Sequence, residues 1–455
     1  MAYDGAEQIY SKGWRPQKQP LFFEICLLDT YGIRRYAVCM RKRFHILLTA
    51  LLLTAVLALP AASGKAETAA QNGELRFADD GTFTVLVLSD LQDTQYPSPY
   101  LNRAMSCLLD TYPVDLVVLL GNQLDGESFV LRVGNAYENV KTAITRLLEP
   151  LHQRSLPFVV IPGGHDYDAP VSVKRQLELY RESQMCILPE TTQSGAYRLP
   201  VYHSADDEVL LNLYLFASEG AAGTVSDEQV AWYNETSAAL RAENGNLPTP
   251  SVAFMHTIVP EAYELFEAAA KGEPGAVQGE GSGTGGYYLL DSDRVFTGEV
   301  QQAPSASMEN SGLFDSFLGN DDVFLAVSGN DPGNSFIASL RGVDLASVPS
   351  GTYTGENSEQ NRGVRLFRFN ETNVKDYETI LVPFSDFGTA QGIGALHYYL
   401  TTTTRISNAV KVIAATVLTV TALAVLLYLI LKPDRRISDT EYPDEANEKP
   451  EDPYL

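Results

Sequence analysis

The stretch VLVLSDLQDTQY (residues 85–96) decides the fold class of this chain. Its aliphatic run ends abruptly at Asp90 and Gln92. A buried strand that delivers polar groups at its carboxyl end is how open α/β sheets build ligand sites. Two similar stretches follow, DLVVLLGNQLDG (residues 115–126) and FVVIPGGHD (residues 158–166). Three apolar strands that each end in a polar, glycine-containing loop predict one composite active-site edge.

Strands and helices alternate around these stretches. Strands are predicted at residues 83–88, 115–120 and 157–161, and helices at residues 100–112, 134–148 and 171–184. This order predicts a parallel sheet with right-handed crossovers. A second half follows, with strands predicted at residues 196–200, 209–216, 252–256, 323–328, 335–340 and 364–369, and helices at residues 226–242 and 260–269. The fold class is therefore α/β.

Composition and charge narrow the classes of function. The chain has 455 residues, of which 45% are hydrophobic, and this permits a large buried core. Its formal net charge is −24. A surface this acidic repels phosphate backbones, so we expect no nucleic-acid partner.

An apolar segment near the N-terminus resembles a secretory signal. MRKRFHILLTALLLTAVLALPAASG (residues 40–64) has a basic start, an apolar core and small residues before its end. Residues 1–39 are then either a mis-assigned start or an unusual extension. If the chain begins at Met40, only Cys107 and Cys186 remain in the exported part. They either form one disulfide or are two buried free thiols.

A second apolar segment, residues 409–432, is long enough to cross a bilayer as a helix. Lys432, Arg435 and Arg436 flank its C-terminal end, as the positive-inside bias expects. These features predict a single-pass cell-membrane protein with its N-terminal domain outside the cell. The expected order is a domain at residues 80–382, a stalk at 383–408, the membrane helix, and a disordered tail at 433–455.

The order of motifs in the domain resembles that of a known family. SDLQ, GNQLDG, PGGHD, FMHTIVPE and SGNDPGNSF resemble the motifs of the calcineurin-like metallophosphoesterases, and most of all their purple-acid-phosphatase-like branch. The resemblance covers residues 83–369. It implies a four-layer α/β/β/α sandwich that holds two divalent metals (Mn, Zn or Fe). These metals would activate a water against a phosphorylated small molecule.

The resemblance also assigns site residues, several of which depart from the family pattern. The metal-ligand positions hold Asp90, Gln92, Asn122, His256 and Asn330, and the phosphate-facing catalytic position holds His165. Asn122 stands where the bridging aspartate belongs, and a neutral amide cannot hold two cations together as a carboxylate does. Gly164 replaces a ligand asparagine, and Asn330 and Pro332 replace two histidines.

These substitutions leave two main hypotheses. The first is a membrane-anchored phosphoester hydrolase with an impaired site that holds one ion or none. The second is a pseudophosphatase whose surface binds a ligand or partner; a purely structural surface domain is a third reading. Neighbouring acids could also repair the site, and the candidates are Asp93, Asp125, Asp166 and Asp331. However, each of these acids is also common at its family position or in a turn, where it caps backbone N–H groups, and we favour this reading over repair.

Overall fold

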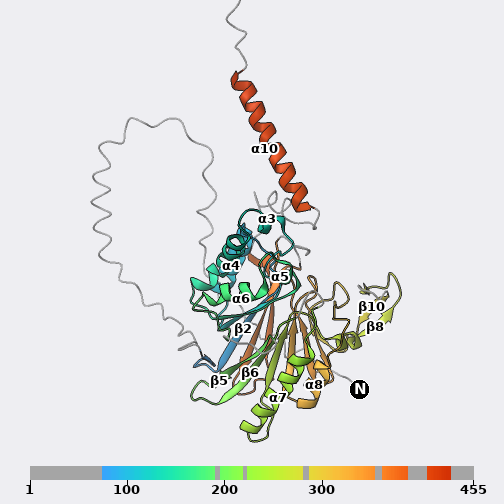
Figure 1. Cartoon of the computed structure of the whole chain (residues 1–455). Coiled ribbons are helices and arrows are strands. Elements are labelled where there is room, and N and C mark those ends of the chain that lie inside the picture. Colours follow the sequence, from blue (N-terminus) through green and yellow to red (C-terminus); the bar gives the residue numbers. More distant parts are fainter. Residues whose placement is uncertain are drawn as a thin grey trace, which may run out of the picture.

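The computed structural model describes residues 74–189, 195–218, 223–279, 286–353, 361–387 and 407–431. Two large sheets stack face to face, and helices cover their outer surfaces (Figure 1). The predicted signal segment, the N-terminal extension and the acidic tail lie outside the described residues.

The first large sheet contains the stretch that opens the domain. Its strand order is β16-β15-β2-β3-β4. The strands are β2 (Thr82–Leu88), β3 (Leu116–Leu120), β4 (Phe158–Ile161), β15 (Gly363–Asn370) and β16 (Glu378–Pro383). β2, β3 and β4 run parallel, and β15 and β16 add antiparallel strands at one side. The carboxyl ends of the three parallel strands therefore share one edge.

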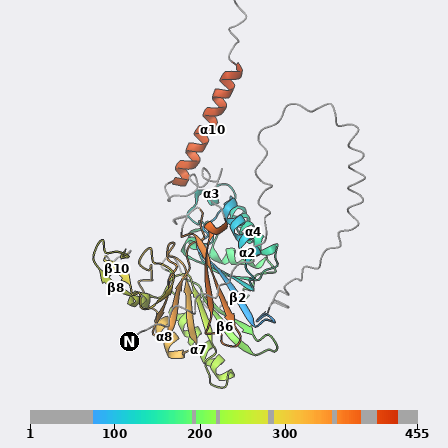
Figure 2. The same cartoon turned by 180° about the vertical axis from the view of Figure 1, so that it is seen from behind.

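The second large sheet has eight strands in the order β1-β5-β6-β7-β12-β14-β13-β11. They are β1 (Leu75–Arg76), β5 (Ala196–Tyr202), β6 (Val209–Phe216), β7 (Ser251–Met255), β11 (Val295–Thr297), β12 (Val323–Ser328), β13 (Ile337–Leu340) and β14 (Val343–Ser347). Its central strands β6, β7, β12 and β14 run parallel. A small sheet of β8 (Phe266–Ala269), β9 (Val277–Gln278) and β10 (Tyr287–Leu290) protrudes at one side (Figures 1 and 2).

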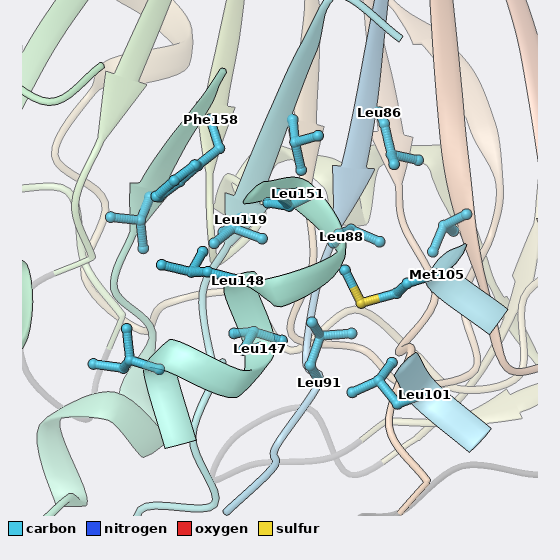
Figure 3. Close-up of a cluster of buried hydrophobic side chains, with 14 of the residues drawn as sticks. Leu86, Leu88, Leu91, Leu101, Met105, Leu119, Leu147, Leu148, Leu151 and Phe158 are labelled. Carbon is cyan, nitrogen blue, oxygen red and sulfur yellow. The ribbon is translucent and has the colours of Figure 1, made fainter. Parts of the chain in front are cut away.

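Three hydrophobic cores separate four layers. One core fills the space between the sheets and contains Val85, Val118 and Phe254. A second lies under α2 (Pro99–Thr111), α4 (Ala136–His152) and α6 (Val173–Arg181), and a third under α7 (Asp227–Glu243) and α8 (Leu313–Asn320). Figure 3 shows the second core, in which leucines of α2 and α4 face leucines of β2 and β3. The predicted α/β/β/α layering is therefore present.

Several local predictions need correction. Residues 260–269 are not one helix, because a short 3-10 helix, η1 (Pro260–Leu265), gives way to strand β8. Two short helices were not predicted, α3 (Phe129–Arg132) and α5 (Gly164–Asp168). The predicted stalk begins with packed structure, since Phe384 of η2 (Phe384–Phe387) is buried. Cys107 and Cys186 are two free thiols, which settles the alternative of a disulfide.

Helix α10 (Ser407–Leu431) covers the segment that was predicted to cross a membrane. Within the described ranges, however, no helix has both the length and the apolar character that a bilayer span requires. The predicted membrane span is therefore not confirmed.

The half-buried carboxyl group of Asp115 fixes the start of β3 against β2. The Thr84 backbone N–H donates to Asp115 Oδ2 at 2.7 Å, and the Asp115 N–H donates to the Thr84 carbonyl oxygen at 2.9 Å. Burial raises the pKa of Asp115 above its ordinary value of 3.8 to about 6. Between these two values the folded protein binds more protons than the unfolded chain, so Asp115 makes the free energy of unfolding fall as pH rises.

We predict that Asp115→Asn flattens this pH dependence between about pH 4 and pH 6, because it removes the titrating group and keeps an acceptor for Thr84. Asp115→Ala should instead cost about 1–2 kcal/mol at pH 7, because the Thr84 N–H loses its partner. Chemical unfolding at a series of pH values checks both. A slope that is unchanged in Asp115→Asn would contradict the assignment.

Candidate functional site

Five loops from the two large sheets meet at one edge. They follow β2, β3, β4, β7 and β12, and they carry in that order Asp90, Asn122, His165, His256 and Asn330. Backbone hydrogen bonds join neighbouring loops: the Asp90 N–H donates to Gly121 O at 3.0 Å, and the Gly329 N–H donates to His256 O at 3.0 Å. The predicted composite edge therefore exists, although both sheets build it.

Asp90 is the centre of this edge. Its side chain is almost completely buried and accepts three hydrogen bonds. Asn122 Nδ2 donates to Oδ1 at 2.8 Å, while the Ser89 hydroxyl and the Asn330 backbone N–H donate to Oδ2 at 2.6 and 3.0 Å. A buried carboxylate needs such donors, because charge taken out of water is costly unless it is hydrogen-bonded. Here the protein itself supplies them.

Asn122 links Asp90 to the loop after β4. Its Oδ1 lies 2.8 Å from the backbone nitrogen of His165, which can only donate. This contact fixes the orientation of the amide, so that Nδ2 must face Asp90. The neutral Asn122 side chain thus connects the Asp90 carboxylate, which follows β2, to the first turn of α5.

His256 supplies the second buried polar group of the edge. Its Nδ1 lies 2.7 Å from the Leu120 carbonyl oxygen and therefore carries a proton. Its Nε2 lies 4.0 Å from Asp90 Oδ1, and among the described residues it has no hydrogen-bond partner. The ring is 1% exposed. His256 Nε2 and the Asp90 carboxylate oxygen are a pair of donor atoms that could face one cation.

The other predicted site residues take different orientations. Asn330 contacts Asp90 only through its backbone, because its side-chain amide donates to Ser305 O at 3.2 Å. Gln92 joins the edge through its N–H, which donates to Asn122 O at 2.9 Å. His165 is half-buried on α5, and its Nδ1 lacks a partner in the described structure. Asp90, Asn122 and His256 are thus brought together by their side chains.

Three of the four acids that could have repaired the site, Asp93, Asp166 and Asp331, accept hydrogen bonds from backbone N–H groups. Asp93 accepts from the N–H groups of Thr94 and Ser98, and its burial raises its pKa to about 7. Asp166 accepts from the N–H groups of Gly163 and Leu124, and its burial also raises its pKa. Both carboxyl groups therefore hold loops in place.

Asp331 follows the same pattern, whereas the Asp125 carboxyl group has the Ser128 side chain as its partner. Asp331 accepts from the Ser305 N–H and from Gln302 Nε2, and burial raises its pKa to about 6. The pKa of Asp125 is also raised by burial, which outweighs the opposing effects of His165 and of a hydrogen bond from Ser128. In the described part of the chain, no group of three or more His, Cys, Asp or Glu side chains is placed to hold a metal ion.

The backbone at this edge is unusual. Asp90, Gln92, Asn122 and Asn330 all have positive φ angles, between 44° and 68°. Non-glycine residues rarely adopt this left-handed conformation, and such outliers gather at ligand sites where the surroundings enforce them. The loops therefore keep a conformation suited to converging side chains, even where the side chains have changed.

Sequence reasoning missed the small residues that make this convergence possible. A Cβ atom on Gly163 would lie 2.7 Å from His256 Cδ2, and one on Gly329 would lie 3.1 Å from Asp90 Oδ2. The Ser350 hydroxyl donates to Asp90 O at 2.8 Å, and Ser89 bonds the carboxylate. The signal was present as small residues directly beside each strand end in SDLQ, PGGHD and SGND.

The residues at this edge do not fit a pair of divalent cations. Two cations a few ångström apart need a bridging carboxylate, and position 122 holds an amide whose NH₂ group points at Asp90. Asp90 and His256 offer two donor atoms, fewer than a closed metal site uses. A Cβ on Gly164 would meet open space, so nothing substitutes for a ligand there.

We predict that Asn122→Ala lowers the free energy of unfolding by about 2–4 kcal/mol, because Asp90 Oδ1 and the His165 N–H lose their partner and each such loss costs about 1–3 kcal/mol. The matched control is Asn246→Ala, since Asn246 is exposed and has a similar φ of 66°. Urea unfolding measures both. If Asn122→Ala and Asn246→Ala lower the free energy of unfolding equally, the loss comes from the backbone conformation alone and not from the hydrogen bonds of the Asn122 side chain.

Comparisons with known proteins found sequence relatives and solved structures, although no family model matches the chain. The chain is 24% identical over 319 residues to probable inactive purple acid phosphatase 28 of Arabidopsis thaliana. The aligned region covers 60% of this chain and 71% of the plant protein. It is 22% identical over 323 residues to probable inactive purple acid phosphatase 29 of the same plant, covering 61% and 73%. A solved dimetal phosphatase from Danio rerio is 12% identical with a TM-score of 0.40, covering 66% of this chain and 99% of that one.

The motif order, the convergence of the five motif loops at one edge, and the two plant relatives point to the same grouping. The similarity to two proteins named as probable inactive purple acid phosphatases supports a place for this chain in the calcineurin-like metallophosphoesterase family.

Proposed function

We propose that this protein is a catalytically inactive member of its family, a pseudophosphatase whose sandwich serves as a rigid scaffold. One observation carries the proposal: Asn122 Nδ2 donates a hydrogen bond to Asp90 Oδ1 at the place where a carboxylate would bridge two cations. The names of the two plant relatives, which describe them as probable inactive phosphatases, support it.

The charge balance at the edge supports the same proposal. Three donors already stabilise the Asp90 carboxylate, so its charge does not require a cation. Among the nearby acids, Asp93, Asp166 and Asp331 hold backbone N–H groups. A cation pair would therefore have to displace hydrogen bonds that keep the loops together.

His165 alone does not supply the missing chemistry. An imidazole can move a proton or contact a phosphoryl group, but hydrolysis also needs an activated nucleophile. In this family the metal ions would generate it from water, and the described residues do not place the donors for the pair. The retained His165 is thus suited to contact a ligand rather than to complete a reaction.

A second candidate is a residual hydrolase that holds a single ion. The observation that favours it is the 4.0 Å separation of His256 Nε2 and Asp90 Oδ1, with no hydrogen-bond partner for Nε2 in the described chain. Such a protein would bind about one equivalent of Mn, Zn or Fe and would show weak metal-dependent hydrolysis.

We also propose that the domain is exported and attached to a membrane through its C-terminal part. The signal-like residues 40–64 support export. For attachment, large apolar side chains are exposed on α10, namely Val417, Leu418, Val420, Leu423, Val425 and Tyr428. A helix with an apolar surface on all sides needs an apolar environment. Protease protection in intact cells, followed by carbonate extraction of membranes, tests both points.

We predict that the purified chain does not hydrolyse an aryl phosphate or an aryl diester above the protein-free rate, with Mn²⁺, Zn²⁺ or Fe²⁺ added. The fourfold variant Asn122→Asp, Gly164→Asn, Asn330→His and Pro332→His should gain bound metal, because the backbone frame is retained and position 164 faces open space. Elemental mass spectrometry measures the metal and release of the phenol measures hydrolysis.

The matched control adds Asp90→Asn to the fourfold variant and should lose the metal, because it removes the carboxylate that accepts from both the Asn122 side chain and the Asn330 backbone N–H. Metal-dependent hydrolysis by the natural chain that disappears in His165→Ala would contradict inactivity and support the single-ion alternative.

A further inference from the structure

A hollow lies next to the edge, where the core under α7 and α8 reaches the surface. It has about 300 Å³ of empty space, part of which is open to solvent. Its lining comes from residues 223–225, residues 255–261 and residues 307–314, and we call it the η1 hollow because the second of these segments enters η1. None of the Asp90 contacts described above accounts for it.

The walls of the η1 hollow are apolar and well packed. Val225, Ile258 and Leu313 line it, are at most 7% exposed, and belong to the core under α7 and α8. Gly223 lets the first segment approach the second, because a Cβ there would lie 2.1 Å from the Thr257 hydroxyl oxygen. The shape of the hollow is therefore fixed by packed side chains and by one close backbone approach.

One carboxylate oxygen in the hollow lacks a hydrogen-bond donor. Glu261 Oε1 accepts from Asn310 Nδ2 at 2.7 Å, and Asn310 Oδ1 accepts from the Gly312 N–H at 2.9 Å, which fixes the orientation of the amide. Glu261 Oε2 is buried, and in the described structure it has no hydrogen-bond partner. Because a buried carboxylate oxygen without a donor is costly, this atom is suited to accept from a bound molecule.

Two hydroxyl groups lie on the same walls. Thr224 Oγ1 and Ser307 Oγ are 2.7 Å apart and join the first segment of the lining to the third. Ser307 Oγ also accepts from the Glu309 N–H at 3.2 Å, so Ser307 can donate its own proton to Thr224. Thr224 Oγ1 then keeps a lone pair that can accept from a ligand.

The charge around the η1 hollow is negative. Among the described residues that line it, Glu261 and Glu309 are acidic and none is Lys, Arg or His. Arg341 lies behind the lining of α8, where it pairs with Glu264 and lies 3.9 Å from Asp315. These four carboxylates and one guanidinium leave a net charge of −3. The surroundings therefore attract a cation.

We propose that the η1 hollow binds a short alkylammonium ligand, which is a primary amine on an aliphatic chain. An ammonium group has three N–H donors and matches Glu261 Oε2 and the Thr224 hydroxyl, while the alkyl part matches the apolar walls. A divalent metal ion fits less well, because it takes six or more oxygen ligands and the hollow is largely apolar. This site is separate from the edge, and it does not depend on whether the edge is catalytic.

Saturation-transfer NMR of the full chain in micelles of a neutral detergent, titrated with butylammonium chloride, tests the proposal. We expect saturable binding with a dissociation constant on the order of a millimolar, as a ligand of so few atoms allows. Butan-1-ol has the same length and no charge. It should bind at least about tenfold more weakly, because a hydrogen bond to a carboxylate is stronger from a charged donor.

Two variants and a control assign the binding to Glu261. Glu261→Gln keeps the size and removes the charge, so it should weaken butylammonium binding at least about tenfold. The matched control is Glu267→Gln, since Glu267 is exposed on β8 and does not line the hollow. Ser307→Met extends an apolar side chain into the hollow and should also abolish binding, and it repeats the test if Glu261→Gln melts early.

Several results would overturn the proposal. Equal binding of butylammonium by the natural chain and by Glu261→Gln would do so, and so would butan-1-ol that binds as tightly as butylammonium. If Glu267→Gln weakens binding as much as Glu261→Gln, net charge and not the hollow is responsible. An absence of saturable binding would mean that water alone meets Glu261 Oε2.

Discussion

The hydrogen bond from the Asn122 amide to the buried Asp90 carboxylate is the constraint on which the edge depends. A carboxylate that is almost fully removed from water must be neutralised by donors or by cations. The amide does so from one side and accepts the His165 N–H on the other. It therefore ties together the ends of β2, β3 and β4 through its two hydrogen bonds. This is why we regard the edge as a self-supporting structure.

The backbone conformation of this edge and the set of side chains that it carries lead to different conclusions about the site. The backbone at this edge has four non-glycine residues with positive φ angles. At Gly163 and Gly329 it passes so close to neighbouring atoms that a Cβ atom would be crowded. Such strain persists only where surrounding contacts over-determine it. The side chains at this edge differ from the ligands that a pair of metal ions needs. An amide occupies position 122, and the Asn330 side chain turns toward Ser305. A frame of this kind still presents a shaped, rigid surface, which fits a role in binding.

The sequence predicted the elements with strong periodicity, and it missed those that depend on tertiary contacts. Continuous apolar runs identified β2, β3 and β6 almost to the residue, and Ser226 caps α7 as expected. Residues 260–269 looked helical by composition, but β10 pairs with residues 266–269 and pulls them into a strand. The orientation of the Asn122 amide depends on a contact across 43 positions, and no local pattern contains that information.

Anomalous diffraction at the manganese edge, from crystals of the natural chain grown with Mn²⁺, tests the central claim most directly. It locates metal ions independently of any activity. We expect the Asn122 side chain to lie within hydrogen-bond distance of Asp90, with no pair of anomalous peaks between Asp90 and His256. Two peaks a few ångström apart at that place, with Asn122 turned to face them, would contradict the account.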